Sequence, residues 1–429
     1  MSAEPKTHSL KIGLLGFGTV GSAFAEVLAA SGADAAITHV FNRNVARKKD
    51  HPRATFVPAN ALWTERVEDV LSAANVDVVI ELMGGLDPAE GWLRTALAAG
   101  KHVVTANKQL IAYKGAELFA LAAKNGVQLL YGAAVGGGVP MIPGIAQGLS
   151  GDRIRRVSGI VNGTCNFILS SMEGGADYSE VLKAAQAAGY AEADPSADVD
   201  GFDARAKLCI LSRLALHAEI DPENVPAQTI KTVSAIDFAY AKELGCTVRQ
   251  VAQASLSETG VTASVGPMLV PKTSPMAFSH GTQNMVVTSG RFGGDVVFSG
   301  HGAGGPPTAV AVMSDVRAIA ENSVQVRLPS HPMVVSGDVT APFYVRFIVA
   351  DEPGIVAAIA GALAKFAVNI DSILQHRGHP DERLPFVVTT EPCSSVTLDK
   401  AVAEMAKLKF MVEPPLCLQI LVVDDRDTD

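Results

Sequence analysis

The sequence predicts an α/β protein with a doubly wound parallel sheet, followed by an α+β domain and a small C-terminal module. Three observations support this division. Short apolar runs alternate with alanine-rich helical segments up to residue 135. Glycine-rich turns and amphipathic helices fill residues 136–328, and beyond residue 341 strand and helix patterns follow in the order βαββαβ. Strands separated by helix-length segments are typical of parallel sheets.

Five apolar runs of strand length lie in the first part, which we expect to form one domain over residues 1–135. Helix-length segments separate them, and such βαβ units place their strands in one parallel sheet that is buried on both faces. The runs are residues 10–15, 37–41, 76–80, 102–105 and 127–131.

A glycine-rich turn follows the first of these strands and precedes the helical stretch 22–30. In such a turn the glycines allow tight bending, close approach of a pyrophosphate and helix packing, while the helix N-terminus favours the phosphate charge. A merely tight strand-to-helix turn is the alternative. The context favours a dinucleotide site of the Rossmann type, formed by Gly16, Phe17, Gly18, Thr19, Val20 and Gly21.

The end of the second strand bears on cofactor choice. It reads Val40-Phe-Asn42-Arg43, whereas an NAD site would often present an acidic residue there to the ribose diol. An arginine would instead favour a 2′-phosphate, so we predict that NADP(H) is preferred over NAD(H). The alternative is that Arg43 is a solvated loop charge.

A second element expected to face the cofactor is the segment from Val103 to Lys108. It is a strand that ends near Thr105, with Lys108 at the start of the next helix. A lysine at a helix start is usually a surface residue, and the helix dipole slightly disfavours it there. We interpret that small cost as a sign of ligand contact.

Two amphipathic helices, residues 178–188 and 202–218, and strands around 285–298 mark the second domain, residues 136–328. We expect Ser179 to cap the first helix and Gly189 to end it. Tyr190–Gly201 should then be a loop, and the last helix of this part should pack back on the first domain.

The segment Ala191–Lys207 carries five carboxylates and then a lysine. Asp203 and Lys207 are four residues apart and share one helix face, which by itself fits an ordinary surface ion pair. The apolar run Leu208–Leu211 instead implies a mostly buried helix. A lysine there needs nearby carboxylates or a lowered pKa, and either suits a proton donor to an alkoxide. On the preceding loop, Glu192 and Asp198 are candidates to bind a substrate ammonium, whereas we expect Asp194 and Asp200 to be solvated.

Together these motifs resemble the homoserine dehydrogenase family over about residues 10–330. The segments that carry the resemblance are Gly16–Gly21, Glu81-Leu-Met-Gly-Gly85, Thr105-Ala-Asn-Lys108, Asn162-Gly-Thr-Cys-Asn-Phe-Ile-Leu169, Gly189-Tyr-Ala-Glu-Ala-Asp-Pro195 with Asp203–Lys207, and Gly302-Ala-Gly-Gly-Pro-Pro-Thr308. The resemblance implies an NAD(P)H-dependent oxidoreductase that reversibly reduces L-aspartate 4-semialdehyde to L-homoserine, on the route to threonine, isoleucine and methionine.

The resemblance also implies roles for individual residues. Lys207 would donate the proton, and Lys108 would lie near both nicotinamide and substrate. The remaining implied contacts are Glu192, Asp198, Asp203, Gly163 and Thr164 with the substrate, and Thr105 and Gly302 with the cofactor.

Family members usually carry a glutamate that helps to hold a monovalent cation, and here that position is Gly132. If the ligand acts through its backbone carbonyl, a Na⁺ or K⁺ site remains, since hard cations accept carbonyl oxygens. If the carboxylate matters, the site is weakened; a flexible interdomain turn is the other reading. The expected ligands are the carbonyls of Gly132, Val135, Gly137 and Val139.

We expect a linker over residues 329–341, a module over 342–422 and a tail over 423–429. The module is similar to a ferredoxin-like ACT domain, with helix 355–366 after the turn Asp351-Glu-Pro-Gly354. This resemblance implies either regulation by an amino-acid effector or a purely dimerising role. The segment Val388-Thr-Thr-Glu-Pro-Cys-Ser departs from the commoner Thr-His pattern, which counts against threonine sensing.

Composition excludes several classes of function. A net charge of −9 without a basic stripe argues against a nucleic-acid partner. No apolar run approaches the roughly 18 residues of a membrane span, and the N-terminus lacks the apolar core of a signal peptide. Five cysteines without paired spacing suit free thiols in the cytoplasm.

Two other functions remain open at this stage, together with the oligomeric state. An acylating semialdehyde dehydrogenase would need a nucleophilic cysteine, for which Cys165 is the candidate. A nucleotide- and amino-acid-binding sensor would need no proton donor. The resemblance implies a homodimer or homotetramer.

Overall fold

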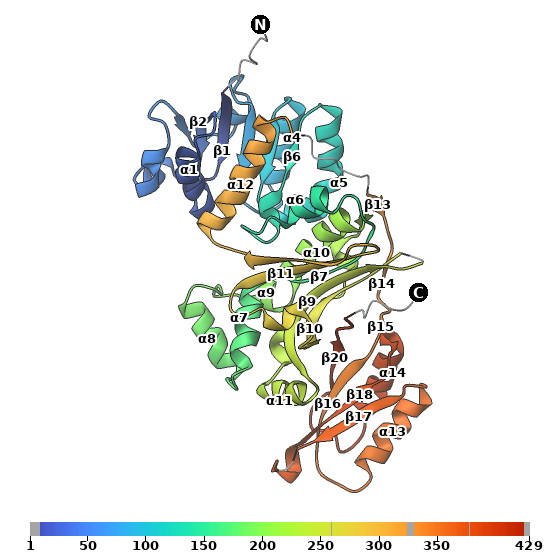
Figure 1. The fold of residues 1–429 in the computed structure, drawn as a ribbon. Helices are drawn as coiled ribbons and strands as arrows, with labels where there is room; N and C mark the ends of the chain where they lie inside the picture. Colours follow the sequence, from blue (N-terminus) through green and yellow to red (C-terminus); the bar gives the residue numbers. More distant parts are fainter. Residues whose placement is uncertain (1–8, 259, 324–329, 377, 424–429) are drawn as a thin grey trace.

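The computed structural model describes residues 9–258, 260–323, 330–376 and 378–423. Figure 1 shows the parallel sheet and the C-terminal module at opposite ends of the molecule, with the sheet of the second part between them. Within the described residues, no helix combines the length and apolar character that crossing a membrane requires.

The first part is a six-stranded parallel sheet in the order β3-β2-β1-β4-β5-β6. The predicted α/β class is therefore confirmed. The apolar run 127–131 is a strand over two residues only, because the chain turns into the loop at Gly132 directly afterwards. The strands are β1 (Leu10–Leu15), β2 (Ala35–Phe41), β3 (Leu62–Thr64), β4 (Val78–Glu81), β5 (His102–Thr105) and β6 (Leu129–Leu130).

Helices cover both faces of this sheet. On one face, α1 (Thr19–Ser31) packs with α12 (Gly305–Ala320), the last helix of the second part, over Ile12 and Leu14. On the other face lie α3 (Glu68–Leu71), α4 (Ala89–Ala98) and α5 (Lys108–Lys124). Because α12 returns across the molecule, the chain crosses between the first two parts more than once.

The second part is an antiparallel sheet with helices against it, in the order β12-β11-β7-β9-β10. Helix α10 contacts β7 and β9 and lies between this sheet and α5. The strands are β7 (Ile154–Ile160), β9 (Cys246–Leu256), β10 (Val261–Pro271), β11 (Gln283–Gly290) and β12 (Gly294–His301), and the helices are α7 (Gly163–Met172), α8 (Tyr178–Ala187), α9 (Ser196–Val199), α10 (Phe202–Ala215) and α11 (Ala235–Glu243).

Two local predictions in this part are wrong. The N-cap of α8 is Asp177, so Ser179 lies inside the first turn of the helix. The segment Tyr190–Gly201 is not all loop, since it contains α9. Asp194 Oδ1 accepts the N–H of Ser196 at 3.0 Å, and this local bond starts a helix too short for hydrophobic periodicity to reveal.

The C-terminal module has the strand order β20-β16-β18-β17, as expected for a ferredoxin-like βαββαβ unit. Strand β20 also pairs in parallel with β10, so the module extends the sheet of the second part. Its elements are β16 (Phe343–Val349), α13 (Ile355–Lys365), β17 (Ile370–Gln375), β18 (Leu384–Thr390), α14 (Ser395–Met405) and β20 (Leu416–Ile420).

The predicted linker is more structured than its turn-forming residues indicate. Strands β13 (His331–Pro332), β14 (Val335–Ser336) and β15 (Thr340–Ala341) pair with β8 (Ala218–Glu219), β10 and β19 (Cys393–Ser394) respectively. Open sheet edges of both flanking parts supply the hydrogen bonds. Residue 329 lies outside the described residues.

The short elements complete the fold. They are α2 (Val45–Lys49), α6 (Met141–Pro143), η1 (Pro52–Phe56), η2 (Gly132–Ala134), η3 (Gly144–Gly148), η4 (Pro222–Asn224), η5 (Ile230–Thr232), η6 (Pro275–Phe278) and η7 (Asp381–Arg383).

Candidate active site

The carboxyl ends of four parallel strands meet at one edge of the first sheet. Leu15 pairs with both Phe41 and Glu81, and Glu81 pairs with Thr105. The glycine turn, Arg43 and Lys108 follow the ends of these strands. They therefore emerge at the same edge, where doubly wound sheets bind their ligands.

The glycine turn has the geometry that a pyrophosphate requires. Gly16 has φ +102°, and a Cβ on Gly21 would come within 2.0 Å of the Gly16 carbonyl oxygen. Beside Gly18 nothing lies within 4 Å of a Cβ position, so a phosphate has room to approach. Phe17 is fully buried with its ring edge-on to Trp63, and Thr19 and Val20 begin α1. The residues present fit a dinucleotide.

Arg43 is exposed just beyond the end of β2, before α2 begins at Val45. Thr105, in contrast, is fully buried, and its hydroxyl donates to Glu81 at 2.6 Å and accepts the N–H of Asn107 at 3.0 Å. The Thr105 side chain therefore shapes the turn that leads into α5.

Lys108 is the first residue of α5, and Asn107 caps that helix by accepting the N–H of Leu110. The Nζ atom of Lys108 lies 2.5 Å from Asp203 Oδ1, and its side chain is 39 % exposed. Lys108, whose unfavourable position at a helix start we interpreted as a sign of ligand contact, thus faces the acidic stretch of the second part.

Asp203 binds Lys207 as well, at 2.7 Å through Oδ2. The side chains of Asp203 and Lys207 are only 6 % and 12 % exposed, so the spacing of four residues forms a buried pair and not a surface one. Lys207 Nζ also donates to the carbonyl of Val161 at 2.7 Å. One carboxylate therefore joins both candidate lysines.

The pKa values of these three groups follow from burial and mutual charge. Burial alone would raise the pKa of Asp203, but the charges of Lys207 and Lys108 hold it well below its usual range. Burial lowers the pKa of Lys207, with Asp203 opposing. Burial also acts to lower the pKa of Lys108, but the charge of Asp203 outweighs it, so the pKa of Lys108 is raised overall. Lys207 is thus the lysine that gives up its proton more readily.

Asn162 is a residue whose role sequence reasoning missed. It caps α7, and its Nδ2 donates to Asp198 Oδ1 at 2.7 Å and to Asp203 Oδ2 at 2.8 Å. In the sequence, Asn162 stands out only as the first residue of the Asn-Gly-Thr motif. Its position before a helix start was the available signal.

The other predicted substrate residues surround this cluster. Gly163 and Thr164 begin α7, and the Thr164 hydroxyl donates to the carbonyl of Tyr190 at 2.7 Å, which ties α7 to the acidic stretch. Glu192 is exposed on that stretch, and its charge adds to those that raise the pKa of Lys108.

The two acidic residues expected to be solvated differ. Asp194 is exposed, as expected. Asp200 is partly exposed and pairs with Lys231 at 2.9 Å, a contact that the expectation did not include. The pairing links the acidic stretch to η5.

The predicted cation loop packs where the two parts meet. Gly132 donates its N–H to Asp315 Oδ2 at 2.8 Å, and a Cβ at Gly132 would lie 2.9 Å from Oδ1 of that carboxylate. A larger side chain at position 132 would have to displace Asp315. The carbonyl of Val139 accepts the N–H of Met141 at 2.7 Å, and Val135 is fully buried.

The same loop contacts the glycine-rich segment before α12. A Cβ at Gly137 would lie 2.6 Å from the carbonyl oxygen of Gly302, and one at Gly305 would lie 2.9 Å from that of Thr19. Only glycines fit these contacts. Gly302 thus packs against the predicted cation loop, and Gly305 packs against Thr19 of the dinucleotide turn.

Cys165 is buried, and its thiol lies 3.2 Å from the carbonyl of Asp198. Burial raises the pKa of this thiol well above its ordinary value. Because the thiolate is the nucleophile, Cys165 is poorly suited to acyl transfer. The acylating alternative therefore loses its candidate.

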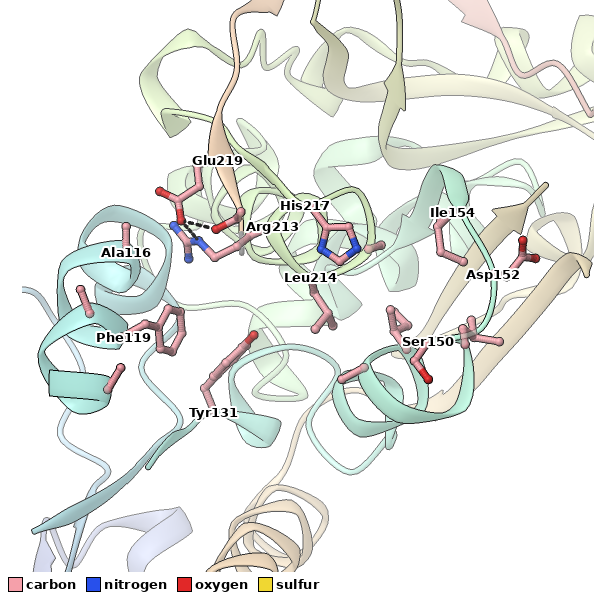
Figure 2. A pocket seen from close by; sticks show the side chains of 17 residues that line it. Ala116, Phe119, Tyr131, Ser150, Asp152, Ile154, Arg213, Leu214, His217 and Glu219 are labelled. Carbon is pink, nitrogen blue, oxygen red and sulfur yellow. Dashed lines mark hydrogen bonds and ion pairs between the residues drawn. The ribbon is translucent and has the colours of Figure 1, made fainter. Parts of the chain in front are cut away.

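A cavity of about 510 Å³ lies beside α5 and the C-terminal half of α10. Figure 2 shows its apolar wall, with Arg213 paired to Glu219 at one end. Arg213 also donates to the carbonyl of Ile111 at 2.8 Å and so joins the two helices. Neither Lys108 nor Lys207 lines this cavity, which is separate from the lysine cluster.

Sequence models of three domain families match the chain. The NAD-binding domain of homoserine dehydrogenase matches residues 16–132, homoserine dehydrogenase matches 140–316, and the ACT domain matches 343–410.

Individual proteins agree with these matches. The chain is 39% identical to a homoserine dehydrogenase of Synechocystis sp. over 433 residues, which is 96% of this chain and 100% of the relative. It is 36% identical to the Bacillus subtilis enzyme, covering 94% of this chain and 96% of that protein.

Solved structures give the same result. A homoserine dehydrogenase from Thiobacillus denitrificans superposes with a TM-score of 0.86 at 32% identity, over 96% of this chain and 98% of that one. A hyperthermophilic archaeal homoserine dehydrogenase in complex with NADPH superposes with a TM-score of 0.64 at 27% identity, over 74% of this chain and 99% of that one. With this agreement over nearly its whole length, and with an ACT domain at its C-terminus, the chain belongs to the homoserine dehydrogenase family.

Proposed function

We propose that this chain reduces L-aspartate 4-semialdehyde to L-homoserine with Lys207 as the proton donor and Lys108 as a second cation at the reacting carbonyl. The observation that carries the proposal is the contact of Asp203 with both lysines, at 2.5 and 2.7 Å. This contact brings the edge of the dinucleotide sheet and the acidic stretch to one point.

The chemistry needs a hydride, a proton and a held carbonyl. When bound, a reduced nicotinamide would supply the hydride to the carbonyl carbon, and the carbonyl π electrons would move to oxygen. Lys207 gives its proton to that oxygen, and the positive charge of Lys108 stabilises the charge that develops there. In the reverse direction neutral Lys207 takes the hydroxyl proton.

Lys207 is suited to this role by its hydrogen bonds. An ammonium has three donors, and those to Asp203 and the Val161 carbonyl occupy two of them. The third remains for the substrate oxygen. Burial, which lowers the pKa of Lys207, makes the proton easier to transfer.

The substrate ammonium would lie against the carboxylates of Glu192 and Asp198. Asp198 is fixed by Asn162, whereas Glu192 is exposed and free to adjust to the ligand. Gly163 and Thr164 at the start of α7 would border the same site.

The decisive assay follows NADPH consumption with L-aspartate 4-semialdehyde. Wild-type protein should turn over, and Lys207→Met should lose on the order of 10²- to 10⁴-fold in kcat. Lys183→Met, at an exposed position on α8, is the control and should match the wild type. A folded Lys207→Met with near-wild-type turnover would remove the assigned role, and NADPH binding without turnover would favour the sensor alternative.

Preference for NADPH over NADH is proposed from Arg43. It is exposed at the end of β2, where no acidic side chain stands in the segment Val40–Asn44. The archaeal relative in complex with NADPH supports the idea. Arg43→Ala should lower kcat/KM for NADPH about tenfold or more and leave NADH unchanged, whereas Arg66→Ala should change neither; equal effects on both cofactors would contradict the preference.

A Na⁺ or K⁺ site at the carbonyls of Gly132, Val135, Gly137 and Val139 remains a proposal. Its support is that this loop is buried between the two parts and contacts Gly302. Activity in Tris buffer should rise on addition of KCl or NaCl and not on addition of tetramethylammonium chloride at equal ionic strength. Equal activity in all three salts would count against the site.

An amino-acid effector at the ACT domain is also proposed. A chain of contacts supports communication with the active site: Arg346 on β16 donates to the carbonyl of Thr232 at 3.4 Å, and the neighbouring Lys231 pairs with Asp200. Asp200 follows α9, which carries Asp198. L-Threonine should change the reduction rate of the wild type, and Lys231→Met should keep the basal rate but weaken that response.

We further propose a homodimer or homotetramer located in the cytoplasm. The five cysteines are free thiols, consistent with a reducing compartment. Light scattering during gel filtration measures the assembly size, and a monomer at micromolar concentration would contradict the proposal. Cell fractionation tests the location.

A further inference from the structure

We propose that Asn162 is a positioning residue for the reduction, because its side-chain amide holds Asp198 and Asp203 as a fixed pair and thereby directs Lys207 and Lys108 to one point. This inference rests on the roles proposed above for the two lysines. It concerns a residue that would touch neither the hydride nor the proton.

Every polar atom of the Asn162 side chain is in use. Its two amide hydrogens go to two different carboxylates, at 2.7 Å to Asp198 and 2.8 Å to Asp203. Its Oδ1 accepts the N–H of Cys165 at 2.8 Å. The residue is only 4 % exposed, and these three hydrogen bonds hold its side chain in the orientation described. The two carboxylates, on α9 and α10, are therefore held at the separation that one amide group sets.

The choice of a neutral amide has an electrostatic reason. Asp198 and Asp203 repel one another, and burial together with the Asp203 charge raises the pKa of Asp198, which the hydrogen bond from Asn162 opposes. A cation between the carboxylates would neutralise the charge needed for the substrate ammonium and for Lys108. The amide stabilises both carboxylates and leaves their charges available.

The neighbouring residue contributes to the same arrangement. The carbonyl of Val161 accepts a hydrogen bond from Lys207 Nζ at 2.7 Å, while Asn162 holds Asp203, the other partner of that ammonium. Two consecutive residues thus set both hydrogen bonds of Lys207. A shift at position 162 would move the proposed proton donor and its counter-ion together.

Asn162 also caps α7, so its structural role has to be separated from positioning. Asn162→Ser keeps a good capping residue but removes the two-armed amide. Asn166→Ala is the matched control: this asparagine lies on the same helix, is fully buried, and donates to Ser279 and the Gln283 carbonyl instead of to carboxylates.

The experiment measures kcat and KM for aspartate semialdehyde reduction against pH in the full-length wild type, Asn162→Ser, Asn162→Asp and Asn166→Ala. Asn162→Ser should fold with a melting temperature close to the wild type and lose roughly 10²-fold in kcat/KM. The acidic limb of its kcat/KM profile should move to higher pH by about one unit, because the hydrogen bond from Asn162 would no longer oppose the rise in the pKa of Asp198. Asn162→Asp, which adds a third carboxylate to the pair, should lose more of its kcat/KM than Asn162→Ser.

Asn166→Ala should lower the melting temperature without moving the pH profile. Wild-type kinetics in Asn162→Ser would overturn the positioning role and leave only capping. An equal loss in Asn166→Ala with an unmoved profile in all variants would overturn it too. If the wild type itself did not reduce aspartate semialdehyde, the proposed function would fail, and this inference with it.

Discussion

Lys108 and Asp203 come from different parts of the fold, yet Nζ of the first lies 2.5 Å from Oδ1 of the second. Lys108 is the first residue of α5, which follows strand β5 of the parallel sheet, and Asp203 lies in the first turn of α10. Their contact joins the edge of the parallel sheet, where we expect the cofactor to bind, to the acidic stretch Ala191–Lys207.

Replacing Asp203 with asparagine should damage both stability and rate. Lys207 is nearly buried and would lose its counter-charge, so we expect the free energy of unfolding to fall by about 3 kcal/mol. Urea unfolding and steady-state kinetics check this. Asp200→Asn removes a more exposed pair with Lys231 and should cost at most about 1 kcal/mol; equal effects of the two variants would contradict the buried role of Asp203.

The same variant should change acid stability. The folded-state pKa of Asp203 is lowered, so its stabilising contribution is fully present above the unfolded value near about 3.9 and is lost as pH falls through the folded pKa. The difference in free energy of unfolding between wild type and Asp203→Asn should therefore narrow when pH is lowered from about 6 to about 3. A constant difference would show that Asp203 does not titrate as described.

Homoserine oxidation should report the pKa of Lys207. This direction needs neutral Lys207, and burial lowers its pKa from the ordinary 10.5, whereas the pKa of Lys108 is raised. The rate should rise with pH and level off below 10.5. Lys207→Arg should abolish this rise of rate with pH, because an arginine does not deprotonate in this range. Lys231→Met should keep the rise. A rise that persists in Lys207→Arg would show that another group titrates.

Gly21→Ala should impair cofactor binding. The added Cβ would lie 2.0 Å from the carbonyl oxygen of Gly16, so the turn has to open. We expect the Kd for NADPH, measured by fluorescence titration, to rise at least about tenfold. Gly91→Ala on α4 is the control: its Cβ meets nothing within 4 Å, and alanine there should stabilise the helix by about 0.5–1 kcal/mol. Unchanged binding in Gly21→Ala would contradict the assigned turn.

Arg346→Met should loosen the C-terminal module from the second part. Arg346 pairs with Asp237 on α11, and Asp237, which is fully buried, also accepts a hydrogen bond from Tyr344 at 2.7 Å. Leaving that carboxylate without its cation should cost about 3–5 kcal/mol, measured by calorimetry of the full chain. Arg383→Met breaks an exposed pair with Glu413 and should cost about 1 kcal/mol or less. Similar losses would contradict the buried network.

Local pattern determined much of this protein. The glycine turn after β1, the parallel strands and the pairing of Asp203 with Lys207 one helical turn later all follow from spacing within short segments. A period of four residues on a helix, or glycines at the end of a strand, has physical meaning without any partner elsewhere in the chain. For the same reason the sequence indicates the order of the three parts along the chain.

Tertiary structure alone decided what those segments meet. The contact of Lys108 with Asp203, the bridge from Asn162 to Asp198, and the pairing of β20 with β10 join residues far apart in the chain. Local patterns also give no sign of such partners, as for Asp200, which Lys231 binds. Hydrogen bonds and ion pairs between distant segments depend on where packing places the backbone, and no local pattern records that placement.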